Sequence, residues 1–164
     1  MTHPLRLAAL ALASALVLAA CGSSSSSSTT SSTTSSATAS SSPRPASVVS
    51  TRTTSLGTFL VDAKGRALYL WDADHGTKST CSGACAQAWP PLTTAGTPKA
   101  SGAAKASLLG TTTRSDGSRE VTYAGHPLYT FAGDTQPGQT SVQGSNGFGA
   151  PWWVVTPAGK ALQN

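Results

Sequence analysis

Short apolar runs separated by polar turns set the pattern of this chain from residue 57 onward. One run is Thr58–Val61, a polar turn ending in Gly65 follows it, and the chain resumes as Arg66–Trp71. Glycine readily adopts the positive φ that a tight hairpin turn requires. The pattern therefore predicts a β-hairpin over these residues.

The returning strand of this hairpin carries apolar or aromatic side chains at consecutive positions. Because side chains alternate between the two faces of a strand, Leu68 and Leu70 share one face. Tyr69 and Trp71 share the other. We therefore expect both faces of this strand to be at least partly covered by the rest of the domain.

The same pattern returns sixty positions later, and this recurrence organises the folded part of the chain. Residues 65–74, which lie in the first copy, and residues 125–134, which lie in the second copy, both fit G-x-x-L-Y-x-[WF]-x-x-D. Further matches at this offset are Gly57 with Gly117 and Val61 with Val121. Trp152 corresponds to Trp89, although it lies three positions beyond the constant offset of sixty. Recurrence at a fixed period indicates a duplicated structural unit. The folded part is therefore predicted to have pseudo-two-fold symmetry.

The second copy repeats the hairpin with small changes. Residues 119–123 form its first predicted strand, Gly125 lies in the turn, and residues 126–131 return. Pro127 cannot donate a ladder hydrogen bond, so this returning strand either starts late or lies at an edge.

Further elements are predicted outside the two copies. Residues 107–113 are rich in Thr and Leu and favour a strand, and residues 152–155 favour a closing strand. Residues 85–88 are compatible with one helical turn that leads into Trp89. We expect an all-β fold, a small antiparallel domain over residues 57–164 built from two pseudo-symmetric repeats that each contain a hairpin, at about 57–92 and 117–157.

The N-terminus has the features of an export signal. Residues 1–20 combine Arg6 with an apolar run that is short and Ala-rich for a transmembrane helix, which is typical of a signal peptide. The segment Leu18–Gly22 resembles the lipobox of bacterial lipoproteins, in which Cys21 receives the lipid and becomes the mature N-terminus. A free cysteine behind an ordinary leader is the alternative. If the cell has an outer membrane, Gly22 is compatible with export to it.

Residues 21–56 separate the predicted lipid from the domain. Between Ser23 and Ser42 nearly every residue is Ser or Thr, so no apolar surface is available to offset the entropy of ordering. We expect a disordered tether with a root-mean-square reach of about 30 Å. It serves either as a spacer or as filler without a selected role.

The charge of the chain does not favour a nucleic-acid partner. The formal net charge is +5, but three of the eleven basic residues precede residue 57. The remaining eight face six acidic residues and form no basic stripe in the sequence. We therefore expect no nucleic-acid partner.

Two cysteines remain once Cys21 is assigned to the lipid. In an exported domain, Cys81 and Cys85 are expected to form a disulfide that fixes the turn before Trp89. An exchangeable thiol pair is one alternative. A copper or zinc site formed with His75 is the other, although the second copy has no cysteines.

The repeat motif offers carboxylates and aromatic rings. Asp74 and Asp134 are expected to cap turns, and an acid–base pair across the pseudo-two-fold axis is the alternative. The aromatic residues are expected to form the core, with Trp152 or Trp153 as the alternative ligand platform. The aromatic candidates are Tyr69, Trp71, Tyr129, Phe131, Trp89, Trp152 and Trp153. No catalytic triad can be assembled from the sequence, so we expect neither enzymatic activity nor a cofactor.

The duplicated motif behind a lipoprotein leader resembles a family of bacterial predicted lipoproteins with a Y-x-[FWY]-x-x-D motif, described as secreted repeats of unknown function. The matching residues are Tyr69–Asp74 and Tyr129–Asp134, and residues 81–85 followed by 89–92 are also similar. Together these features predict a lipid-anchored, non-catalytic binding or structural module of the cell envelope, facing outside the cytoplasm. Its expected partners are the membrane through its lipid and a cell-wall glycan or envelope protein. The alternative is an extracytoplasmic redox or metal protein centred on His75, Cys81 and Cys85.

Overall fold

The computed structural model describes residues 45–163, so the predicted signal peptide and Cys21 lie outside the described residues. Most of its regular structure is β-strand, in agreement with the predicted all-β class. The elements in chain order are β1 (Val48–Thr54), β2 (Gly57–Asp62), β3 (Tyr69–Trp71), α1 (Ala84–Ala88), β4 (Lys99–Ala100), the 3₁₀ helix η1 (Ala106–Leu108), β5 (Leu109–Thr113), β6 (Arg119–Tyr123), β7 (His126–Pro127), β8 (Asn146–Gly147) and β9 (Ala150–Val154).

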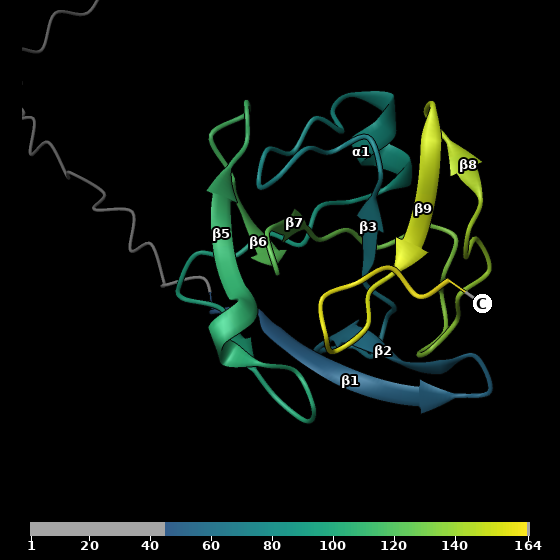
Figure 1. Cartoon of the computed structure of the whole chain (residues 1–164). Coiled ribbons are helices and arrows are strands. Elements are labelled where there is room, and N and C mark those ends of the chain that lie inside the picture. Colours follow the sequence, from purple (N-terminus) through teal and green to yellow (C-terminus); the bar gives the residue numbers. More distant parts are fainter. Residues whose placement is uncertain (1–44, 164) are drawn as a thin grey trace, which may run out of the picture. The chain divides into compact units, whose positions relative to one another are not determined.

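The strands, most of which are labelled in Figure 1, form three small sheets. Hydrogen-bonded neighbours follow the orders β2-β1-β4, β3-β9-β8 and β5-β6-β7. The neighbours are antiparallel except for β1 and β4, which run parallel. Pro127 lies in β7 at the edge of its sheet, where its missing N–H interrupts no further pairing, as the sequence predicted.

Each copy begins with a hairpin that precedes the motif. In the first copy β1 pairs with β2, with Thr51 opposite Leu60, and in the second β5 pairs with β6, with Thr111 opposite Val121. The prediction that the tether extends to residue 56 is therefore wrong, because Val48–Thr54 is a strand. This strand buries Val49 completely, whereas its Ser and Thr residues resemble the composition of the preceding tether.

The returning strand of the first copy separates two hydrophobic clusters. Leu68 and Leu70 pack into one cluster, and Tyr69 and Trp71 pack into the other. The predicted assignment of the two faces is confirmed, and both faces are covered. β3 lies between these clusters and pairs with β9 from the end of the second copy.

The segment at the end of each copy completes the hairpin of the other copy. In one half the N–H of Leu60 donates to the C=O of Val155 at 2.8 Å, and the N–H of Val155 donates to Leu68 at 3.0 Å. In the other half Val121 donates to Leu92 at 2.8 Å, and Leu92 donates to Leu128 at 2.8 Å. The two copies are therefore intertwined.

This hydrogen-bond pattern changes one detail of the sequence alignment. It makes Leu60 equivalent to Val121, whereas the constant offset of sixty paired Val61 with Val121. The turn between the paired strands is one residue longer in the first copy, which accounts for the shift. The predicted helical turn before Trp89 is present as α1.

Candidate functional site

The two motif tyrosines meet at the pseudo-two-fold axis. The N–H of Tyr69 donates to the C=O of Tyr129 at 2.8 Å, and the N–H of Tyr129 donates back to Tyr69 at 3.0 Å. This reciprocal pair is a single antiparallel bridge between the copies. The motif therefore lies where the two copies join.

The tyrosine side chains cross this axis. The hydroxyl of Tyr69 donates to Oδ2 of Asp134 at 2.6 Å, and the hydroxyl of Tyr129 donates to Oδ2 of Asp74 at 2.5 Å. The tyrosine of each motif is thus bound by the aspartate of the other motif. The spacing of the motif is explained by a contact between copies and not within one copy.

The second oxygen of each aspartate closes a loop. Oδ1 of Asp74 accepts from the backbone N–H and the hydroxyl of Thr80, at 2.8 and 2.7 Å. Oδ1 of Asp134 accepts in the same way from Ser141, at 3.2 and 2.6 Å. The expected turn-capping role is therefore present in an extended form, over six or seven residues, and both oxygens of each carboxylate have partners.

The buried hydroxyls of the motif are held in the neutral form. Burial raises the pKa of Tyr69, and the hydrogen bond from its hydroxyl to Asp134 raises it further. Burial also raises the pKa of Tyr129, with the negative charges of Glu120 and Asp74 adding to the effect. Both tyrosines are therefore donors to carboxylates and not acids in the physiological range.

A stack of aromatic rings continues from the axis. Trp89 of the first copy lies flat on Trp152 of the second, with ring centroids 3.8 Å apart and planes 2° apart. Trp152 also stacks on Trp71 at 5.1 Å, and Trp89 meets Phe131 at 4.7 Å. Each tryptophan therefore packs against the motif aromatic of the other copy.

Trp152 lies in the core, as expected, because its side chain is completely buried in this stack, so the alternative of a ligand platform does not apply to it. Its indole N–H donates to the C=O of Gly147 at 2.9 Å, which also satisfies its polar atom. Trp153 is half-buried, and its indole N–H donates to Asp72 at 3.0 Å. Trp153 remains the accessible ring of the pair.

Cys81 and Cys85 form the predicted disulfide beside the aromatic stack. Both cysteines are buried, and His75 is exposed. Among residues 45–163 no three His, Cys, Asp or Glu side chains gather as a metal site would require. The alternative of a metal centre at His75, Cys81 and Cys85 is therefore not supported by the geometry.

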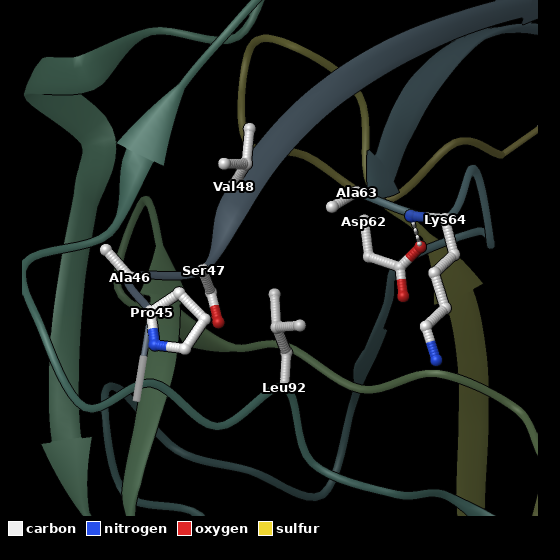
Figure 2. Close-up of a pocket in the computed structure, with 8 residues that line it drawn as sticks. All are labelled: Pro45, Ala46, Ser47, Val48, Asp62, Ala63, Lys64 and Leu92. Carbon is white, nitrogen blue, oxygen red and sulfur yellow. Dashed lines mark hydrogen bonds between the residues drawn. The ribbon is translucent and has the colours of Figure 1, made fainter. Parts of the chain in front are cut away.

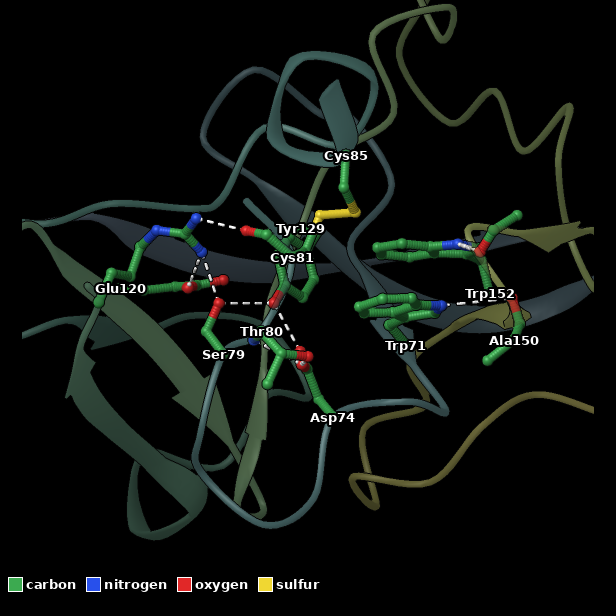
Figure 3. Close-up of a disulfide and its surroundings, with 12 residues drawn as sticks. Trp71, Asp74, Ser79, Thr80, Cys81, Cys85, Glu120, Tyr129, Ala150 and Trp152 are labelled. Carbon is green, nitrogen blue, oxygen red and sulfur yellow. Dashed lines mark hydrogen bonds and ion pairs between the residues drawn. A yellow bond between two sulfur atoms is a disulfide. The ribbon is translucent and has the colours of Figure 1, made fainter. Parts of the chain in front are cut away.

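A chain of hydrogen bonds links Tyr129 to a buried ion pair (Figure 3). Arg114 donates to the hydroxyl of Ser79 at 2.5 Å, and the hydroxyls of Ser79 and Tyr129 are 2.7 Å apart. Because Tyr129 already donates to Asp74, we assign the Ser79 hydroxyl as the donor to Tyr129. Arg114 also donates to Glu120 at 2.8 Å and to the C=O of Cys81 at 2.5 Å.

Glu120 is completely buried in this network, and one of its oxygens, Oε1, has no hydrogen-bond partner among the described residues. Burial raises the pKa of Glu120 to about 7, against the opposing effect of Arg114. Neither Arg114 nor Glu120 could be found from the motif, because both lie upstream of it. Since Leu60 is equivalent to Val121 by its hydrogen bonds, Phe59 is equivalent to Glu120. A charged residue in one copy at a position that is apolar in the other is the sequence signal that could have identified Glu120.

One pocket lies where the described chain begins (Figure 2). It measures about 220 Å³ and is lined by Pro45–Val48, Leu92 and the turn at Asp62–Lys64. The Asp62 carboxylate is already bound by Arg66 at 2.7 Å and by the N–H of Lys64 at 2.9 Å. The walls are mainly apolar, and the pocket is separate from the motif residues.

Comparison with known proteins gives one result. A family model described as a secreted repeat of unknown function matches the chain twice, over residues 50–93 and 110–156, which together are more than half of its length. No curated protein and no solved structure matches the chain. Among residues 45–163 we find no helix with the length and apolar character needed to cross a membrane.

Proposed function

Since the chain belongs to the family of secreted repeats of unknown function, we propose that it is a lipid-anchored, non-catalytic module of the cell envelope. The observation that supports a non-catalytic role is that the motif residues bind the two copies to each other. Tyr69 is bound by Asp134 and Tyr129 by Asp74, and the remaining carboxylate oxygens accept from Thr80 and Ser141.

A catalytic carboxylate must reach the proton that it transfers, directly or through one water. Asp74 and Asp134 are at most 6% exposed, and their oxygens are already engaged. This geometry supports a structural role for the motif. The activity of the module then belongs to its surface, as in other folds that carry function on grafted sites.

The proposed anchor is a lipid on Cys21, with the domain held outside the cytoplasm. Two or three acyl chains anchor stably where a single chain is marginal, because each buried methylene contributes about 0.8 kcal/mol. The test is metabolic labelling with a radioactive fatty acid, for which we expect incorporation into the natural chain and none into Cys21→Ser. Undiminished labelling of the Cys21→Ser chain would refute the anchor.

The proposed partner is a cell-wall glycan or a protein of the envelope. Trp153 is the accessible aromatic ring for stacking on a sugar, and Phe148, which is 52% exposed at the β8–β9 turn, provides a matched aromatic control. If a glycan is the partner, retention of the purified chain on peptidoglycan should fall in Trp153→Ala and persist in Phe148→Ala. Equal retention of all three chains would exclude Trp153 as a sugar platform.

A further inference from the structure

The strand β5 has an unpaired edge. Val121 of β6 donates to Leu92 and accepts from Leu128, so its backbone groups point away from β5. In an antiparallel pair the opposite residue, Thr111, must then point its own N–H and C=O away from β6. Thr113 has the same orientation two residues later. Within residues 45–163 the backbone groups of Thr111 and Thr113 have no hydrogen-bond partner.

The first copy shows what this edge accepts. There the equivalent strand, β1, is covered by β4 and the residues after it, which run parallel to β1. Lys99 donates to the C=O of Ser47 at 2.9 Å, Ser101 donates to Val49 at 2.9 Å, and Ala103 donates to the hydroxyl of Thr51 at 3.0 Å. An extended segment therefore occupies the edge of one copy, while the same edge of the other copy is open.

A pocket adjoins the open edge and gives it a charge preference. It measures about 410 Å³, and its lining includes Pro98, Leu109, Thr111 and Arg119 but no acidic side chain. The Arg119 guanidinium makes long hydrogen bonds, of 3.3 Å to the Thr111 hydroxyl and 3.4 Å to the C=O of Ala95, and is exposed. A carboxylate placed in this pocket would gain a charge-assisted partner.

We propose that the β5 edge binds an extended, acidic peptide segment of another envelope protein by strand addition. Backbone pairing with Thr111 and Thr113 would hold the segment, and one Glu or Asp side chain would enter the pocket toward Arg119. This inference rests on the proposed function in its choice of partner, an envelope protein. The peptide test and the fatty-acid test are independent, so failure of one is distinguishable from failure of the other.

The chain itself does not supply a suitable acidic segment. Residues 1–44 contain no Asp or Glu, so the N-terminal part lacks the carboxylate. Of the six acidic residues in the chain, four are buried, and the exposed ones are Asp72 and Asp116. Asp72 binds Trp153, and Asp116 binds Ser118 in the β5–β6 turn, so a second copy would not present either from a free strand.

The experiment measures binding of a fluorescent probe, acetyl-Thr-Val-Glu-Val-Thr-amide, to the purified whole protein, with the Gln peptide as its matched partner. We expect the Glu peptide to bind about tenfold more tightly than the Gln peptide, and Arg119→Gln to abolish this difference. Thr111→Pro should weaken both peptides about tenfold, since it removes an outward N–H without breaking the β5–β6 ladder. Thr111→Val keeps the N–H but loses the hydroxyl that accepts from Arg119, so the loss of affinity in Thr111→Pro beyond that in Thr111→Val measures the backbone pairing.

A peptide with N-methyl groups on alternate residues tests the same point without changing the protein, should Thr111→Pro fail to fold. Two such peptides are compared, one methylated at the odd positions and one at the even positions. Only one of these two sets of N–H groups faces β5, so methylation of that set should abolish binding. The proposal is wrong if neither probe binds at about 1 mM, if the Glu and Gln peptides bind equally to the natural chain, or if both methylation registers leave binding unchanged.

Discussion

The two copies are joined by equivalent Tyr–Asp hydrogen bonds, but they differ in the segment between the motif aspartate and the tryptophan that follows it. In the first copy this segment contains the disulfide and α1 and leads to Trp89. In the second copy it is three residues longer, lacks cysteines, and reaches Trp152 through the β8–β9 hairpin. Each segment leads to a tryptophan, Trp89 or Trp152, and these two rings stack on each other. The crossed Tyr–Asp pairs and the stack therefore define the fold, and the segments between them can vary.

The copies also differ in the residues that lie next to their motif tyrosines. The second copy places the ion pair of Arg114 and Glu120 next to Tyr129, whereas the first has Thr54 and Phe59 at the equivalent positions. Phe59 packs into the aromatic cluster without a polar partner. One copy therefore has a buried charge network where the other has an apolar contact, and this difference sets the largest predicted effect.

Glu120→Ala should destabilise the protein by about 3–5 kcal/mol, because it leaves the Arg114 guanidinium buried without its carboxylate. The double change Arg114→Thr with Glu120→Phe restores the residues of the first copy and should cost much less, since replacing a buried pair by apolar groups is often neutral. Urea denaturation measures both free energies of unfolding. A double variant as unstable as Glu120→Ala would show that the two sites are not interchangeable.

Leu68→Ala and Leu128→Ala should each lower the free energy of unfolding by about 2–5 kcal/mol, because both side chains are completely buried at equivalent positions. The two losses should agree within about 1 kcal/mol if the copies are equally packed. Thermal or urea unfolding of the two variants side by side checks this. A loss below about 1 kcal/mol in one variant would mean that its cavity collapses, and that the symmetry does not extend to packing.

Tyr69→Phe and Tyr129→Phe should each cost about 1.5–3 kcal/mol, since each removes a buried hydrogen bond to a carboxylate. The loss should be larger for Tyr129, because its hydroxyl also contacts Ser79 and connects to Arg114. The double variant, measured in the same way, tests whether the two crossed bonds act independently. Equal losses would indicate that Ser79 contributes little to Tyr129.

Much of this fold could be predicted because the hairpins carry local signals. The alternation around Leu68 and Tyr69 assigned both faces of β3, and the disulfide followed from counting cysteines in a chain expected to be exported. The strand β1 was missed because its Ser and Thr residues match the tether. Extending the offset of sixty upstream would have paired Val49 with Leu109 and Thr51 with Thr111, both of which lie in equivalent strands.

The candidate site could not be predicted in the same way, because its contacts join residues far apart in the chain. Tyr69 and Asp134 are 65 positions apart, and no pattern within one copy distinguishes a partner in the same copy from one in the other. The ion pair of Arg114 and Glu120 is local, but nothing in the sequence shows that it is buried beside Tyr129. Intertwining is a property of the assembled fold.

An effect in the lower part of the range given for the tyrosine variants is expected for the disulfide, which is the clearest difference between the copies. Its loop is closed over four positions, so removing it by Cys81→Ser with Cys85→Ser should cost about 2 kcal/mol by loop-closure entropy. The bridge holds the loop whose carbonyl at Cys81 accepts from Arg114 and whose continuation, α1, leads to Trp89. In the second copy the bond from Trp152 to Gly147 holds the equivalent ring without any bridge.

The second copy therefore indicates that a tryptophan can be positioned by hydrogen bonds alone, and the double serine variant should still fold. We expect a lower thermal midpoint and unchanged retention on cell-wall material, measured below the midpoint of the variant. The natural chain in a reducing agent is the matched control, because it loses the bridge without any substitution. If the variant stays folded and loses retention, the bridge belongs to the binding surface and its role is not limited to stability.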